Sequence, residues 1–287
     1  MKTIGFIGLG IMGKPMCLNL IKAGYHLVVF DLNESSVATV VSAGAESAPS
    51  PKAVAEQVEI IISIVPDTPH VEEVCFGPQG LIHGLRAGQL FIDMSTINAS
   101  TEQKISDAFQ AKGCLTLDAP VSGGEPGAQQ GTLSIMVGGS EEAYQQAVPL
   151  FEVLGSKVSL IGGPGAGQIT KSCNQIATAL ATQGVIEALS LAKKAGVDPH
   201  KVREAMLGGF AQSKALEISG KKMIDRDFAP GFMVKLYRKD LGIGQQVGRE
   251  LAVPLPGASL VATEMDHLIA KGQAEQDFSA LITLFDA

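Results

Sequence analysis

The chain has 287 residues, which is more than one domain usually holds, so we expect two domains. It is 46% hydrophobic and 18% charged, a composition typical of a folded globular protein. Its formal net charge of -7 argues against a nucleic-acid partner, because phosphate backbones are bound by basic surfaces. No apolar run reaches the roughly 18 to 20 residues that a membrane helix needs. We therefore predict a cytoplasmic protein that binds neither nucleic acid nor a membrane.

The cysteine and histidine residues do not indicate a metal site. Neither the four cysteines nor the five histidines have the spacing of a ligand cluster or a redox pair. We expect the cysteines to be reduced thiols, most of them buried. The sequence therefore predicts no bound metal.

Short β-rich runs alternate with helical patterns from Thr3 to about Ile161. The runs are TIGFI, HLVVFD, EIIISIV, LFIDMS, CLTLDAP, LSIMVGG and KVSLI. This rhythm is typical of βαβ units. Several runs are apolar without alternation, so helices should cover both faces of the sheet. For residues 1–162 the sequence predicts an α/β fold of the Rossmann type, with a doubly wound, mainly parallel sheet.

The helix after LFIDMS carries a start signal. Ser100 and Gln103 have the spacing of a capping box, in which the serine side chain bonds a helix amide and the glutamine reaches back. The sequence therefore predicts that Ser100 is the N-cap of this helix.

Strand-like runs end at the loop GGPGAG, residues 162–167, and helical periodicity continues to the C-terminus. The segment from Gln168 to Ala195 is interrupted only by Gly184 and predicts a helix of about 28 residues. Further helices are expected to begin near Pro199, Ala211, Lys235 and Ser259. Residues 163–287 are therefore predicted to form an all-α second domain.

A glycine-rich turn, Gly8 to Gly13, lies directly between the first strand and a helix. In this context Gly8 permits a tight turn, Gly10 lets a pyrophosphate approach the backbone, and Gly13 lets helix and strand pack closely. We expect Ile11 and Met12 to complete the turn around the cofactor. The alternative is a glycine turn that binds nothing.

Asp31 ends the second strand, 18 residues after Gly13. A dinucleotide fold places at this point the acid that accepts hydrogen bonds from the adenosine ribose. A carboxylate there repels a 2′-phosphate, and no arginine follows in DLNES. We therefore favour NAD(H) as cofactor, with NADP(H) possible. The alternative is that Asp31 is a solvated strand end.

Two later strand ends should reach the same carboxyl edge of the sheet, where open α/β folds bind ligands. They carry Val65 and Pro66 in one case and Thr96 in the other. Val65 is placed to pack on a ring, and Thr96 to hydrogen-bond nicotinamide or ribose. Either segment alone is also compatible with an ordinary loop.

The fifth strand leads into a polar, glycine-dense loop that contains Ser122, Gly123 and Gly124. Small residues expose backbone N–H groups, and successive N–H groups form an anion site to which the Ser122 hydroxyl adds a donor. This loop is a candidate for binding a substrate carboxylate. A plain turn is the alternative.

Lys171, Asn174 and Gln175 share one face near the start of the long helix. If that face meets the Ser122 loop, a proton donor, an amide and an anion site surround one small volume. A solvated helix face would also use such residues. Lys239 and Asp240 form a helical charge pattern that is unremarkable alone.

Four segments together resemble the β-hydroxyacid dehydrogenase family. They are GFIGLGIMG at the N-terminus, DAPVSGG at 118–124, GAGQITKSCNQ at 165–175 and KDL at 239–241. The resemblance implies NAD(P)-dependent hydride transfer, an active site between the two domains, and a helical domain that drives assembly into a homodimer or homotetramer. It assigns catalysis to Lys171, contacts with a small carboxylate substrate to Ser122, Gly123, Gly124 and Asn174, and contacts with the cofactor to Phe232 and Lys239.

Within that family, the segment DAPVSGGEPGAQQGTLSIMVGG is most similar to the tartronate semialdehyde reductases. The chain departs from them at Met233, Lys235, Tyr237 and Arg238, which leaves the substrate open. Relatives that act on 3-hydroxyisobutyrate, succinate semialdehyde, sulfolactaldehyde or glyoxylate share the same motifs. The non-enzymatic alternative is a dinucleotide-binding scaffold.

Overall fold

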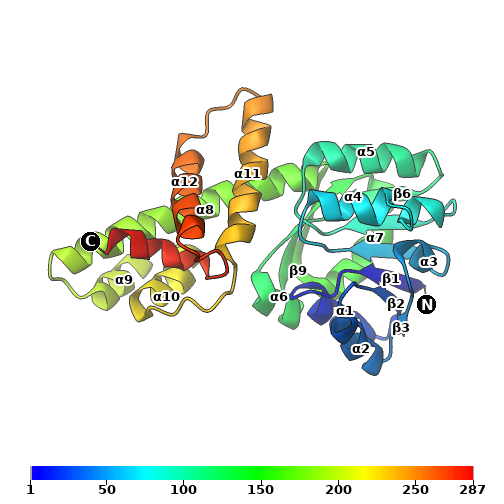
Figure 1. The fold of residues 1–287 in the computed structure, drawn as a ribbon, viewed down its shortest axis with the longest axis horizontal. Coiled ribbons are helices and arrows are strands. Elements are labelled where there is room, and N and C mark those ends of the chain that lie inside the picture. The colour runs from blue at the N-terminus through cyan, green and yellow to red at the C-terminus, as the bar shows by residue number, and fades with distance from the viewer. Residues whose placement is uncertain (1, 287) are drawn as a thin grey trace. The chain divides into compact units, whose positions relative to one another are not determined.

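The computed structural model describes residues 2–286, which form two compact units, one up to Lys171 and the other from Ser172 onward (Figure 1). The first unit is a sheet covered by helices, and the second consists of helices. Helix α8 (Ala166–Lys194) begins in the first unit and continues into the second. The domain boundary after residue 162 stays a prediction. Among residues 2–286, no helix is long and apolar enough to cross a membrane.

The sheet has nine strands in the order β3-β2-β1-β4-β5-β6-β8-β7, with β9 paired to β8. The first six strands in this order are parallel, whereas β8 runs antiparallel to β6 and β7. Their bounds are β1 Thr3–Ile7, β2 His26–Phe30, β3 Glu46–Ser47, β4 Ile60–Ser63, β5 Leu90–Asp93, β6 Leu115–Asp118, β7 Val121–Ser122, β8 Leu133–Gly139 and β9 Gly155–Gly162. The predicted doubly wound, mainly parallel sheet is confirmed.

Each face of the sheet has its own apolar core, because successive side chains of a strand point to opposite faces. On β1, Phe6 belongs to one core and Ile7 to the other. The first core packs on α1 (Gly13–Lys22), α2 (Glu34–Ser42), α6 (Gly124–Gln130) and α7 (Glu141–Leu154). The second packs on α3 (Pro51–Ala55), α4 (Thr68–Phe76), η1 (Leu81–His83) and α5 (Ala99–Gln110). Burial on both faces explains why these strands are continuously apolar.

The predicted capping box at Ser100 is wrong. Helix α5 begins at Ala99, and its N-cap is Asn98 in an extended conformation. Gln103 donates instead to Asp107, one turn further along the helix. The cause is tertiary: the amide of Asn98 donates to Thr68 Oγ1 at 3.3 Å, which ends the extended segment before Ser100.

The second unit contains the rest of α8 and α9 (Pro199–Leu207), η2 (Ala215–Ser219), α10 (Gly220–Asp225), α11 (Val234–Glu250), α12 (Pro256–Ala270) and η3 (Phe278–Phe285). The predicted all-α organisation is confirmed. The helix expected near Ala211 starts later, with the π-helical segment η2, where the Ser213 hydroxyl accepts from the Leu216 amide at 3.0 Å. The short helix η3 was not predicted, although Ala280 and Leu281 within it are buried.

Candidate active site

The three glycines of the first turn differ in whether the fold could accept a side chain at their positions. Gly8 has φ +95°, and a Cβ there would collide with the carbonyl of Ile64. A Cβ on Gly13 would collide with the Gly8 carbonyl. A Cβ on Gly10, in contrast, would meet nothing within 4 Å. The fold itself therefore needs Gly8 and Gly13, whereas Gly10 leaves open space of the kind that a dinucleotide pyrophosphate would fill.

Asp31 lies immediately after β2 and contacts the glycine turn. One carboxylate oxygen accepts from the Leu9 amide at 2.5 Å, and the other accepts from the Asn33 amide at 2.7 Å. Each oxygen retains a further lone pair for a ligand hydroxyl. Ile11, within the turn, is half exposed. The glycine turn thus contacts a carboxylate and presents an exposed apolar side chain.

The carboxyl ends of β4 and β5 lie side by side, next to the strand that leads into the glycine turn. The Val65 amide donates to Ser95 Oγ at 2.9 Å, which joins the two strand ends. Pro66 is exposed and Thr96 is half-buried. The structure thus brings Val65, Pro66 and Thr96 to one edge of the sheet, as the parallel topology predicts.

Lys171 lies beside the Ser122 loop. Its Nζ donates to the carbonyl oxygen of Val121 at 2.8 Å, and Val121 directly precedes Ser122. Gly123 and Gly124 are exposed, with φ +132° and +60°. Such backbone conformations favour glycine and leave the adjacent amides uncovered by side chains. An ammonium group and a small, polar loop therefore share one site.

Asp118 anchors the first turn of α8, the helix that carries Lys171. Its Oδ1 accepts from the Gly165 amide at 2.8 Å, and its Oδ2 accepts from the Gln168 amide at 2.9 Å. Burial raises the pKa of Asp118, and these backbone hydrogen bonds oppose that rise. A carboxylate accepting from the first amides of a helix is a capping arrangement. Sequence reasoning missed this role, although an aspartate at the end of a buried strand was a usable signal.

Asn174 and Lys239 are linked within the helical unit. Asn174 Nδ2 donates to Gln175 Oε1 at 2.9 Å, and Gln175 Nε2 donates to Asp240 Oδ2 at 2.7 Å. The other oxygen of Asp240 lies 3.0 Å from Lys239 Nζ. Tyr237 donates its hydroxyl to the Gln175 carbonyl at 2.9 Å. Gln175 was predicted to share a helix face with Asn174, and Asp240 was predicted only as part of a charge pattern with Lys239. The structure shows that these two residues link Asn174 to Lys239.

The segment that carries Phe232 is held by Asp277. The amides of Gly231 and Phe232 both donate to Asp277 Oδ2, at 2.9 and 3.0 Å. The Phe232 ring packs against Tyr237 at a centroid distance of 5.1 Å. This buried aspartate is a further residue that spacing in the sequence did not reveal.

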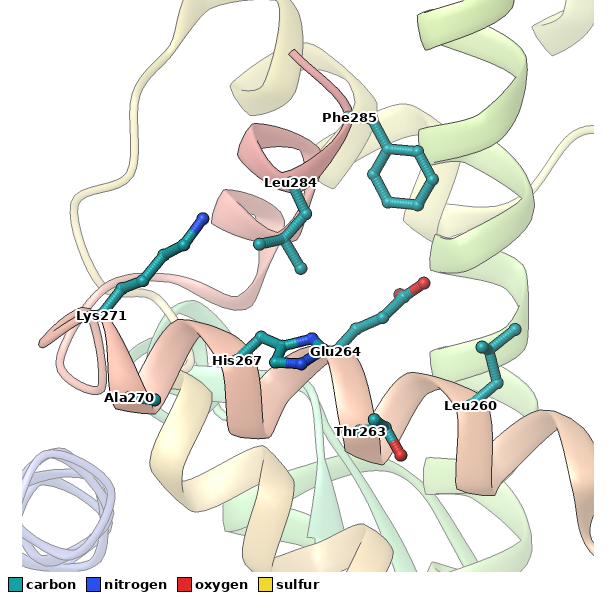
Figure 2. Close-up of a pocket in the computed structure, with 8 residues that line it drawn as sticks. All are labelled: Leu260, Thr263, Glu264, His267, Ala270, Lys271, Leu284 and Phe285. Carbon is teal, nitrogen blue, oxygen red and sulfur yellow. The ribbon is translucent and has the colours of Figure 1, made fainter. Parts of the chain in front are cut away.

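The helical unit also has a surface hollow. Its volume is about 670 Å³, and Figure 2 shows that its side chains come from α12, from Lys271 directly after α12, and from η3. The lining is mostly apolar, with Glu264, His267 and Lys271 among it. None of the predicted site residues lines this hollow.

Two family models match the chain. Residues 3–162 match the NAD binding domain of 6-phosphogluconate dehydrogenase. Residues 165–285 match the model described as NAD-binding of NADP-dependent 3-hydroxyisobutyrate dehydrogenase. Both descriptions name a nicotinamide dinucleotide, which confirms the predicted cofactor class.

The relatives agree with the family models over the full length. The chain is 45% identical to the 2-hydroxy-3-oxopropionate reductase of Escherichia coli, over 97% of this chain and 95% of the relative. It is 40% identical to the NAD-dependent L-serine dehydrogenase of Pseudomonas aeruginosa, over 100% of this chain and 98% of the relative. A solved structure of Mycobacterium tuberculosis 3-hydroxyisobutyrate dehydrogenase with L-serine matches with a TM-score of 0.92, at 31% identity and with full coverage of both chains. The chain therefore belongs to the β-hydroxyacid dehydrogenase family and is an NAD(P)-dependent oxidoreductase.

Proposed function

We propose that this enzyme reduces a small 3-oxo acid to the hydroxy acid, with Lys171 as the general acid. The observation that carries the proposal is the contact of the Lys171 ammonium with Val121, at the edge of the Ser122 loop. When bound, NAD(P)H supplies the hydride that adds to the carbonyl carbon. Lys171 donates a proton to the carbonyl oxygen and is left neutral, so the product is an alcohol. In the oxidative direction, neutral Lys171 accepts this proton.

The Ser122 loop is proposed to bind the substrate carboxylate. The protein carries a net charge of -7, so an anion needs local hydrogen-bond donors. Ser122 supplies a hydroxyl, and the exposed Gly123 and Gly124 supply backbone amides. Asn174 lies three residues after Lys171 on α8 and therefore on the same helix face. We assign to its amide the role of orienting the ammonium or the reacting oxygen.

The cofactor is proposed to be NAD(H) in preference to NADP(H). Gly8, Gly10, Ile11, Met12 and Gly13 would hold its pyrophosphate, and Asp31 its ribose hydroxyls. Val65, Pro66 and Thr96 would contact the nicotinamide half, together with Phe232 and Lys239. The preference rests on Asp31, because a carboxylate repels a 2′-phosphate at the same position.

Tartronate semialdehyde, reduced to glycerate, is the substrate that we propose first. Two observations support it: the 45% identity to the Escherichia coli reductase and the resemblance of the segment DAPVSGGEPGAQQGTLSIMVGG to tartronate semialdehyde reductases. The alternative is 3-hydroxyisobutyrate, because the family model over residues 165–285 is described by that substrate. We also propose a cytoplasmic homodimer or homotetramer.

The substrate assignment is tested by steady-state kinetics with NADH and NADPH. The panel comprises tartronate, methylmalonate, succinate and sulfolactate semialdehydes, together with glyoxylate. We expect the highest kcat/KM for tartronate semialdehyde with NADH. A different aldehyde preferred by about tenfold or more, a margin that one pocket contact can supply, overturns the substrate assignment. Absence of turnover across the panel and in the reverse direction overturns the proposed reaction.

A further inference from the structure

A pair of buried carboxyl groups lies behind the candidate site, and the proposed reaction does not use it. Asp93 ends β5, and Glu102 lies on α5. Their exposed fractions are 0% and 4%. Each carboxyl group acts on the pKa of the other through a side-chain hydrogen bond, which lowers the pKa of Asp93 and raises that of Glu102. Two carboxylates have no proton to share, so one member of this pair must be the neutral acid.

The surroundings assign the proton to Glu102. Asp93 Oδ1 accepts from Ser63 Oγ at 2.5 Å and from Ser95 Oγ at 2.7 Å. Asp93 Oδ2 has no nitrogen or hydroxyl donor within residues 2–286, so a proton on Glu102 supplies the missing donor. Burial raises the pKa of Glu102 well above its usual value, and the charges of Asp93 and Asp118 raise it further.

No cation among these neighbours compensates the pair. The titratable groups that act on it from the packed elements are Asp118 at the end of β6 and Cys75 on α4. Burial raises the pKa of the Cys75 thiol, so it stays neutral beside the carboxyls. Glu102 also accepts from the amide of Gln168 on α8, and this hydrogen bond lowers the pKa of Glu102.

Gln168 connects this pair to the candidate active site. Its Nε2 donates to Glu102 Oε1 at 3.0 Å and to the Ser95 carbonyl at 2.9 Å. Its Oε1 accepts from the Ile97 amide at 3.1 Å. One buried amide therefore joins α5, the segment on either side of Thr96, and the first turn of α8. Lys171 follows on α8 three residues later.

We propose that Glu102 is a positioning residue, which donates its proton to Asp93 and accepts from Gln168, and so places the Thr96 segment and the first turn of α8. The proposal rests on the role of Lys171 proposed above. Ionised Glu102 would face the Asp93 carboxylate without a donor between them, and this repulsion would push the two side chains apart. The chemistry at Lys171 would then lose its fixed geometry, which enzymes need within a fraction of an ångström.

The test compares Glu102→Gln, which keeps a donor and an acceptor without charge, with Glu102→Leu, which keeps the volume but neither. We measure kcat and KM for NADH. Glu102→Gln should stay within about twofold of the wild-type kcat, whereas Glu102→Leu should lose about tenfold or more, as misplacement by an ångström does. Ile105→Ala on the same helix is the control, because it opens an apolar cavity and should lower Tm with little change in kcat.

A second readout follows the proton and needs no turnover. A group whose pKa is raised by folding stabilises the protein less as pH rises from its usual pKa toward its folded pKa. Wild type loses this stabilisation as pH rises, whereas Glu102→Gln has no carboxyl group at this position and does not lose it. The Tm of Glu102→Gln minus that of wild type should therefore increase between pH 5.5 and pH 8.

The outcomes separate the two proposals. Equal kcat in Glu102→Leu, Glu102→Gln and wild type overturns the role of Glu102, as does a Tm difference that is independent of pH. If Glu102→Leu fails to fold, Gln168→Met removes the same contact from the other side, and a wild-type kcat in that variant overturns the proposal. Turnover that survives in Lys171→Ala overturns the proposed function instead, and the Tm comparison still reports on Glu102.

Discussion

The ammonium group of Lys171 donates a hydrogen bond to the carbonyl oxygen of Val121 at 2.8 Å, across 50 positions of sequence. This contact joins the first turns of α8 to the loop that begins at Ser122. A lysine held in this way has a defined position for its proton, which an exposed lysine lacks. General acid catalysis depends on such a position more than on the presence of the residue type.

Lys171→Ala should abolish turnover and spare cofactor binding. Loss of a positioned general acid typically costs about 10²- to 10⁴-fold in kcat. Binding of NADH, followed by its fluorescence, should change little, because the glycine turn and Asp31 lie on other elements. Lys104→Ala, at an exposed lysine of the same unit, is the control and should leave both quantities unchanged. Residual kcat of more than about a tenth would remove Lys171 from the role of general acid.

Asp31→Asn should narrow the preference for NADH over NADPH. The substitution removes the charge but keeps the side-chain volume and an oxygen that can accept from the Leu9 amide. Relief of charge repulsion worth about 1.4 kcal/mol changes the ratio of the two kcat/KM values about tenfold. The measurement is this ratio in wild type and variant. An unchanged ratio would show that Asp31 does not contact the adenosine ribose.

Gly10→Ala and Gly13→Ala should separate cofactor binding from folding. A methyl group on Gly13 meets the backbone carbonyl of Gly8, so this variant should lose about 1–3 kcal/mol of unfolding free energy. Gly10 has no positive φ and its methyl group meets no protein atom, so Gly10→Ala should fold normally. Its Kd for NADH should rise about tenfold or more, because the methyl group occupies the path of the pyrophosphate. Urea unfolding and NADH titration test both expectations. A wild-type Kd for NADH in Gly10→Ala would show that the pyrophosphate does not bind beside Gly10.

The sheet and the cofactor class were predictable because their signals are local. Strands buried on both faces are continuously apolar, and the Gly8 to Gly13 turn lies within a single βα unit. Asp31 was proposed as a cofactor residue from its distance to Gly13 along one βαβ unit. Each of these patterns is completed within about 30 residues, the length of such a unit.

The contacts around Lys171 were not predictable in this way. Which face of α8 meets which loop depends on how helices pack, and spacing identifies only residues that share a face. Gln168, Glu102 and Asp118 were missed because each acts through a partner 47 to 66 positions away. The capping box failed for the same reason, since the contact of Asn98 with Thr68 overrides the local signal at Ser100.

Asp277 should make the helical unit sensitive to acid. Burial acts to raise the pKa of Asp277, but hydrogen bonds from Ser279, Phe232 and Gly231 outweigh it and hold this pKa below its usual value. Lys222 Nζ, 3.1 Å away, also pairs with this carboxylate. A carboxyl group whose pKa is lowered by folding stabilises the protein above its unfolded pKa, and this stabilisation is lost as pH falls through the folded pKa.

Asp277→Asn should therefore cost about 1–3 kcal/mol of unfolding free energy at pH 7, as loss of a buried charged acceptor does. The difference from wild type should shrink as pH falls from about 5 toward 3, because wild-type Asp277 then becomes protonated as well. Asp266→Asn is the matched control. Its partner Arg238 is at the surface, and such exposed pairs contribute about 0–1 kcal/mol. Urea unfolding of the three proteins across this pH range is the measurement. A cost for Asp277→Asn that stays constant from pH 7 to pH 3 would mean that the carboxylate charge does not hold the Phe232 segment, and that the shape of the side chain alone does.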